Sequence, residues 1–205
     1  MASGRLTRVV VLDFDGTLID SNSLKYQAFF QLFPDESTQG IVRSVLDEMF
    51  EASRYEILAE ILARCGHSQS EDLQAEVQFL AAAFNEIVVA GAKRCREIEG
   101  AVQALKYLSS RVRLYVSSTT PEEALKEIIA FRGWSGYFVD VFGYPRKKVE
   151  TLAAIIEREQ VASELVVVVG DGESDRVSAE KNHCAFIPVH GAFPFAEVAR
   201  LIEGD

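Results

Sequence analysis

Two aspartates that lie two residues apart, Asp13 and Asp15, are the first side chains that could do chemistry. They come at the end of the apolar run RVVVLDF, and Gly16 then allows the chain to turn sharply. While the backbone stays extended, side chains at i and i+2 point the same way. Two carboxylates on one face repel each other unless a cation joins them or one holds a proton. The pair therefore indicates a metal site or acid–base chemistry, although Asp-Gly alone is also an ordinary turn signal.

A second acidic segment, GDGESD at residues 170–175, follows another apolar run, LVVVV. Capping of the next helix accounts for Ser174 or Asp175, because such residues are favoured at helix starts. Capping does not account for Asp171, which directly follows the buried run. We therefore expect Asp171 to lie at the same edge of the fold as Asp13.

A third segment, SSTTPEE, combines a helix start with spare hydroxyl groups. Thr120 as N-cap, Pro121 at the first helical position and Glu123 at the third form a capping box. This leaves Ser117 or Ser118 as a hydroxyl that can bind an anion together with the free amides of the helix start.

A basic triplet, Arg146-Lys147-Lys148, opens a later helix after Pro145. Cations at a helix start oppose the helix dipole. A solvated surface is one interpretation, but the placement is easier to understand if one lysine neutralises a bound phosphate.

The elements that position these residues alternate between strands and helices. Short β-branched, apolar runs predict buried strands at Arg8–Phe14, Val112–Val116, Tyr137–Phe142, Leu165–Gly170 and Cys184–Val189. Helical patterns follow at Val102–Ser109, Glu122–Phe131, Val149–Glu159, Asp175–Lys181 and Phe195–Ile202. This order predicts an α/β fold with a Rossmann-like, doubly wound parallel sheet, in which the residues after each strand collect at one edge.

Residues 20–97 break this alternation, because strand signals fade and four helical stretches follow one another, at about 22–33, 38–52, 54–64 and 71–90. We interpret this segment as an inserted all-helical cap domain. The α/β core then comprises residues 1–19 and 98–205.

The four segments, in this order, resemble the haloacid dehalogenase-like (HAD) hydrolase superfamily, most closely its phosphoglycolate-phosphatase-like branch with a helical cap. The segment DFDGT at residues 13–17 is similar to the family's nucleophile motif, and GDGESD to its second acidic motif. Ser118 is preferred to Ser117 because the family's hydroxyl usually precedes a proline by three positions. Lys148 is preferred to Lys147 on its spacing from Gly143.

The resemblance implies a Mg²⁺-dependent phosphatase. Asp13 would attack phosphorus to give an aspartyl phosphate, and Asp15 would protonate the leaving alcohol and later deprotonate water. The implied Mg²⁺ ligands are the carboxylates of Asp13 and Asp171 and the backbone carbonyl of Asp15. Asp175 would anchor Lys148 or a metal-bound water.

Other activities of the same fold stay open. The family's dehalogenases lack the second aspartate, so Asp15 disfavours dehalogenation. Phosphonate hydrolysis needs a lysine in the cap, where Lys25 and Lys93 are present, and a phosphomutase or a non-catalytic relative is also possible. Substrate choice is expected to come from the cap, with Arg54 and Lys25 as candidate contacts.

The composition limits the classes of partner that we expect the protein to bind. The 205 residues carry 31 acidic and 21 basic side chains, a net charge of -10, which argues against nucleic-acid binding. No apolar run approaches the ~20 residues of a membrane span, so neither a membrane partner nor secretion is expected. Three cysteines, interpreted as buried, fit a cytoplasmic protein better than a disulfide scaffold. The expected partner is a small phosphorylated metabolite, bound by a monomer or small homo-oligomer.

Overall fold

The computed structural model describes residues 7–49, 52–67 and 71–204. The chain divides into two compact units. Residues up to 20 combine with residues from 95 onward in one, which we call the core unit, and residues 21–94 form the other, the helical unit. The sequence placed the insertion at 20–97, so it begins one residue later and ends three residues earlier than expected.

The shift has a physical cause in the two segments that join the units. The backbone amide of Asp20 donates a hydrogen bond to the carbonyl of Arg96 at 2.8 Å, and Ile19 forms a bridge with Glu97. Arg132 also donates to the carbonyl of Cys95 at 2.6 Å. Residues 95–97 therefore pair with the core unit, although their sequence resembles a linker.

The core unit is built on a parallel sheet whose strand order, within the described residues, is β3-β2-β1-β4-β5. The strands are β1 (Val9–Leu12), β2 (Arg113–Pro121), β3 (Asp140–Tyr144), β4 (Val166–Gly170) and β5 (Ala185–Pro188). The central strands β1 and β4 are buried along their whole length, which explains their uninterrupted apolar sequences. Val10 pairs with Leu114 on one side and with Val167 on the other.

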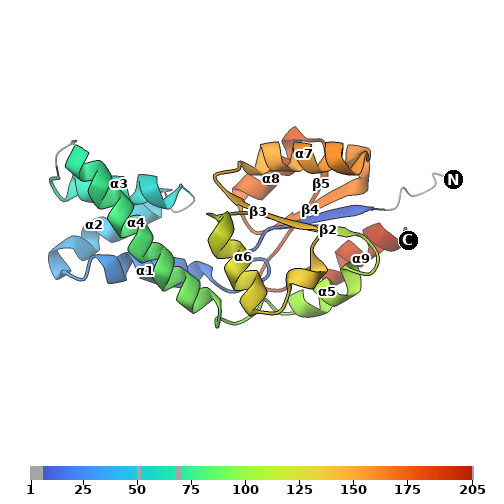
Figure 1. Cartoon of the computed structure of the whole chain (residues 1–205), viewed down its shortest axis with the longest axis horizontal. Coiled ribbons are helices and arrows are strands. Elements are labelled where there is room, and N and C mark those ends of the chain that lie inside the picture. The colour runs from blue at the N-terminus through green and yellow to red at the C-terminus, as the bar shows by residue number, and fades with distance from the viewer. Residues whose placement is uncertain (1–6, 50–51, 68–70, 205) are drawn as a thin grey trace. The chain divides into compact units, whose positions relative to one another are not determined.

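Helices cover both faces of this sheet (Figure 1). They are α5 (Ala101–Leu108), α6 (Glu122–Phe131), α7 (Lys148–Glu159), α8 (Glu173–Lys181) and α9 (Phe195–Glu203). Figure 1 shows α7 and α8 on one face and α5 and α9 on the other. On the first face, Leu152 and Ile155 of α7 and Ala179 of α8 pack against the valines of β1 and β4. The predicted α/β class, a doubly wound parallel sheet with an inserted helical segment, is confirmed.

Two strands, β2 and β3, differ most from their predicted ranges. β2 continues to Pro121, five residues past the predicted end, because the polar segment after Val116 still pairs with β3 through a register shift. β3 begins at Asp140, since residues 135–137 form a 3₁₀ turn. Gly143 makes the first difference possible: a Cβ there would lie 2.4 Å from the carbonyl oxygen of Thr120, so only glycine lets the two strand ends approach this closely.

The helical unit contains α1 (Asn22–Leu32), α2 (Glu36–Met49), α3 (Arg54–Arg64) and α4 (Glu71–Ala92), close to the predicted ranges. It has its own apolar core, to which all four helices contribute. By length and composition, residues 72–92 of α4 would also suit a membrane span, which the sequence analysis did not anticipate. Here the face with Leu73, Val77, Ala81, Phe84 and Val88 is packed within the unit, as in a helix of a protein core.

The three cysteines, expected to be buried, are thiols that are only partly buried. Cys65 ends α3, Cys95 lies in the returning segment, and Cys184 directly precedes β5. Ends of elements are less enclosed than their middles, which explains the difference.

Candidate active site

The first two acidic segments meet because the strands that precede them are neighbours in the sheet. Asp13 follows β1, Asp171 follows β4, and the amide of Asp13 donates to the carbonyl of Val169 at 2.9 Å. Both strands point the same way, so their carboxyl ends share one edge. Asp13 is buried and Asp171 is exposed, so the edge is open to solvent on the side of Asp171.

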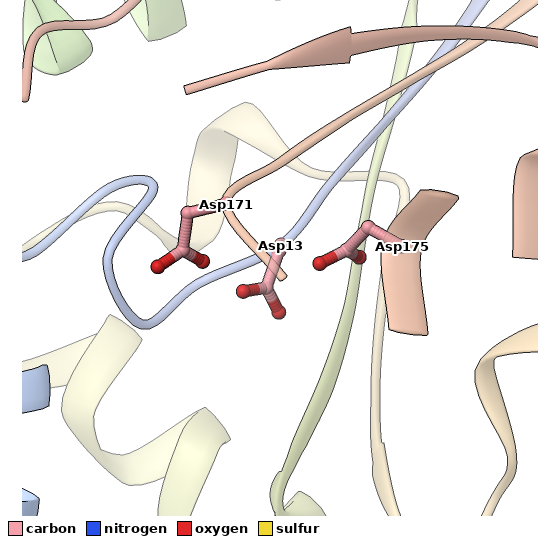
Figure 2. A group of neighbouring side chains, drawn as sticks. All are labelled: Asp13, Asp171 and Asp175. Atoms are coloured by element: carbon pink, nitrogen blue, oxygen red, sulfur yellow. The ribbon is translucent and has the colours of Figure 1, made fainter. Parts of the chain in front are cut away.

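Carboxylate oxygens of Asp13, Asp171 and Asp175 lie within 4.8 Å of one another. Figure 2 shows Asp13, on the segment that follows β1, between the other two. Hard divalent cations such as Mg²⁺ and Ca²⁺ prefer oxygen ligands of this kind. Oδ2 of Asp175 is buried and has no hydrogen-bond partner among the residues that the structure describes. The three carboxylates and this unsatisfied oxygen fit a cation-binding site.

Lys148 is the cation that the structure places among these carboxylates. Its ammonium donates to Oδ1 of Asp13 at 2.8 Å and to Oδ1 of Asp175 at 2.9 Å. Burial alone would lower the pKa of Lys148, but the two carboxylates outweigh it and raise the pKa above its usual range, so the ammonium stays charged. Lys147, the alternative left open by the sequence, is exposed.

The carboxylate of Asp175 packs closely against the backbone of Gly170. A Cβ on Gly170 would lie 2.3 Å from Cγ of Asp175, so glycine is required at the end of β4. Burial, followed by repulsion from Asp13, raises the pKa of Asp175 to about 7, although Lys148 opposes the shift. Three carboxylates around one lysine leave excess negative charge, which a bound cation would offset.

Asp15 is positioned by hydroxyl groups from the end of β2. Its Oδ2 accepts a hydrogen bond from Oγ1 of Thr120 at 2.7 Å and another from Oγ of Ser118 at 3.3 Å. The amide of Thr120 in turn donates to the Ser118 hydroxyl at 3.1 Å. All three residues are buried. The structure thus places Ser118 beside the second aspartate.

The predicted capping box is wrong. Helix α6 begins at Glu122, Pro121 occupies the N-cap position, and no side chain caps the helix there. Thr120 still belongs to β2, and its hydroxyl donates to the carboxylate of Asp15. A charged acceptor forms the stronger hydrogen bond, which explains the outcome. Thr120 is therefore a site residue that the sequence analysis missed.

The remaining predicted residues, Lys25 and Arg54, belong to the helical unit. The carboxylates and Lys148 described above belong to the core unit. Arg54 begins α3 after the capping residue Ser53 and donates to Oδ1 of Asn85 at 3.3 Å. Its guanidinium also lies 5.6 Å from the ring centroid of Phe84. Lys25 is half-buried on α1.

Lys148→Met is expected to destabilise the metal-free protein by about 3 kcal/mol, because it leaves the Asp13 and Asp175 carboxylates buried without their cation. Urea denaturation in the presence of a chelator measures the change. Lys147→Met is the matched control, since its exposed side chain should contribute less than about 0.5 kcal/mol. Equal stability of the two variants would show that the buried ion pairs do not support the fold.

Comparison with protein families matches residues 10–189 to the family described as haloacid dehalogenase-like hydrolase. Two relatives are phosphoglycolate phosphatases. The one from Vibrio parahaemolyticus is 25% identical over 193 residues, covering 87% of this chain and 81% of the relative. The one from Aquifex aeolicus is 28% identical over 185 residues, covering 82% and 78%.

Among solved structures, that of the Bacillus subtilis protein YfnB bound to magnesium is similar over 98% of this chain and 100% of its own, with a TM-score of 0.72 and 16% identity. A hydrolase-like protein from Bacteroides fragilis is similar over 97% and 93%, with a TM-score of 0.73 and 18% identity. These likenesses concern the fold.

Proposed function

Because the chain belongs to the haloacid dehalogenase-like hydrolase family, we propose that it is a Mg²⁺-dependent phosphatase that hydrolyses a small phosphorylated metabolite. The observation that carries the proposal is the buried contact of Lys148 with Asp13 and Asp175 at the edge where Asp15 and Asp171 also lie. The phosphoglycolate phosphatases among the relatives support a phosphomonoester as the substrate class.

In the proposed first step, a carboxylate oxygen of Asp13 attacks phosphorus in line. The bond from phosphorus to the substrate's alcohol oxygen breaks, Asp15 gives its proton to that oxygen, and Asp13 carries the phosphoryl group as an aspartyl phosphate. In the second step, Asp15 takes a proton from water as the water oxygen attacks phosphorus. Inorganic phosphate leaves, and both aspartates return to their starting states.

The other residues of the site offset the negative charge of the substrate and of the carboxylates. A phosphomonoester dianion is repelled by the carboxylates at this edge, and the buried Lys148 ammonium offsets part of that repulsion. Asp175 anchors the ammonium, and the Ser118 hydroxyl can donate to a phosphoryl oxygen. When bound, Mg²⁺ supplies further positive charge. Its proposed ligands are the carboxylates of Asp13 and Asp171 and the carbonyl of Asp15.

Excess chelator is expected to abolish phosphatase activity, and added Mg²⁺ to restore it. Ca²⁺ should oppose Mg²⁺, because the larger ion accepts more ligands and can draw both oxygens of Asp13 away from attack. Activity is measured on an aryl phosphate, together with the rise in melting temperature that Mg²⁺ causes. Full activity in chelator would instead indicate a metal-free hydrolase.

The same measurements on Asp171→Asn identify the site. This variant should lose the Mg²⁺-induced thermal shift, because it removes one proposed ligand. Glu173→Gln is the control, since Glu173 is an exposed acid two residues away that pairs with Arg176.

A panel of phosphorylated metabolites assayed with Mg²⁺ would then identify the substrate. Arg54 and Lys25 stay proposed substrate contacts, and a cytoplasmic location stays part of the proposal.

A further inference from the structure

We propose that Thr120 is a positioning residue for the reaction, and that its hydroxyl fixes the carboxylate of Asp15 in the orientation that proton transfer requires. The inference rests on the proposed role of Asp15 as proton carrier. It adds a residue that the motif comparison does not assign.

The contact is short and enclosed. Oγ1 of Thr120 lies 2.7 Å from Oδ2 of Asp15, shorter than the 3.3 Å from Oγ of Ser118 to the same oxygen. Thr120 is 4% exposed and Asp15 is 7% exposed, so water competes little for either group. A hydroxyl that donates to a buried carboxylate restricts the rotation of that carboxylate.

The backbone around Thr120 directs its hydroxyl toward Asp15. Ser118 and Thr120 lie two positions apart on an extended strand, so their side chains point the same way, and Thr119 between them is exposed. The register shift between β2 and β3 falls in this segment. Gly143 admits the carbonyl of Thr120 where any Cβ would collide with it. These features fix the backbone of Thr120 at the end of β2.

The division of labour between the two hydroxyls follows from their partners. The Ser118 hydroxyl also accepts a hydrogen bond from the Thr120 amide, which orients it, and it is the hydroxyl assigned to the phosphoryl group. Thr120 makes the shorter contact with Asp15 and can keep that carboxylate in place while Ser118 turns to substrate. Thr120 thus acts on the reaction through Asp15.

Thr120→Val keeps the shape of the side chain and removes the hydroxyl. On an alkyl phosphate, whose leaving oxygen needs a proton, kcat should fall by about 10-fold to 10²-fold with KM within a few-fold, because misplaced groups lose rate. On an aryl phosphate, which needs little protonation, the pre-steady-state burst that reports phosphorylation of Asp13 should change by less than a few-fold, although steady-state turnover also falls because Asp15 must still activate water. A normal burst on the aryl phosphate also shows that the variant is folded.

Thr120→Ser should restore alkyl phosphate turnover, because it restores the donor. Thr119→Val is the matched control and should behave as wild type on both substrates. If Thr120→Val does not fold, Thr120→Ala provides the same comparison. A burst on the aryl phosphate that slows as much as alkyl phosphate turnover, or failure of serine to rescue, would overturn the proposal.

A double variant separates this proposal from the proposed function. Adding Thr120→Val to Asp15→Asn should produce no further loss on the alkyl phosphate, since the group being positioned is already inactive. A further loss of 10-fold or more would mean that Thr120 acts elsewhere. If Asp15→Asn alone slowed the burst on the aryl phosphate as much as alkyl phosphate turnover, the acid–base role of Asp15 would itself be wrong.

Discussion

Asp13→Asn is expected to lower phosphatase turnover on the order of 10⁶-fold, the size of loss that removal of a covalent nucleophile causes. The carboxamide has nearly the shape of the carboxylate, so the strand end should keep its conformation. It is neutral, however, and a poor nucleophile. It also loses the ionic contact with Lys148, whose ammonium lies 2.8 Å from Oδ1 of Asp13 in the wild type.

Initial rates on an aryl phosphate in saturating Mg²⁺ measure this loss. Asp140→Asn is the matched control, because Asp140 begins β3, at the opposite end of the strand from the site, and pairs with Arg158. That variant should retain turnover within a few-fold. If Asp13→Asn kept more than a tenth of the wild-type rate, the nucleophile would have to be another residue.

Asp15→Asn is expected to slow hydrolysis of an alkyl phosphate by about 10²-fold to 10⁴-fold, the effect of losing a general acid–base. The substitution leaves the backbone carbonyl at position 15 in place, so Mg²⁺ should still produce its thermal shift. An aryl or acyl phosphate should still phosphorylate Asp13, because its leaving group needs little protonation. The phosphoenzyme should then persist, since no group activates water.

Mass spectrometry of the intact Asp15→Asn variant, after reaction with an acyl phosphate, should show one added phosphoryl group. The addition should disappear when Asp13→Asn is introduced into the same chain. Near-wild-type turnover on the alkyl phosphate, without accumulation, would show that a different residue carries the proton.

The meeting of Asp13 with Asp171 could be predicted because it follows from topology. Both residues come directly after apolar runs, and parallel strands bring their carboxyl ends to one edge whatever the details of packing. The choice of Lys148 over Lys147 needed the resemblance to a family. A physical signal was also present: Lys148 falls on the buried stripe of α7 with Leu152 and Ile155, whereas Lys147 falls outside it.

Thr120 shows why the rest of the site could not be predicted. Its local sequence matches a capping box. Such a pattern describes only contacts with near neighbours in the chain, here the amides of the next helix. The group that binds its hydroxyl is Asp15, 105 residues earlier in the chain. The same limit applies to Arg54, whose partner Asn85 lies on a different helix. Contacts of this kind depend on the register of packed elements, which periodicity does not specify.

The pairing of residues 19–20 with residues 96–97 means that the helical unit leaves and rejoins the core at adjoining points. The whole inserted segment can therefore be treated as one surface loop whose two ends are held together by the core unit. Closing such a loop costs only about 0.6 kcal/mol more for each doubling of its length. Evolution can lengthen, shorten or exchange the segment without repacking β1 or its neighbours. The core unit can thus keep its packing while the length and sequence of a single insertion change.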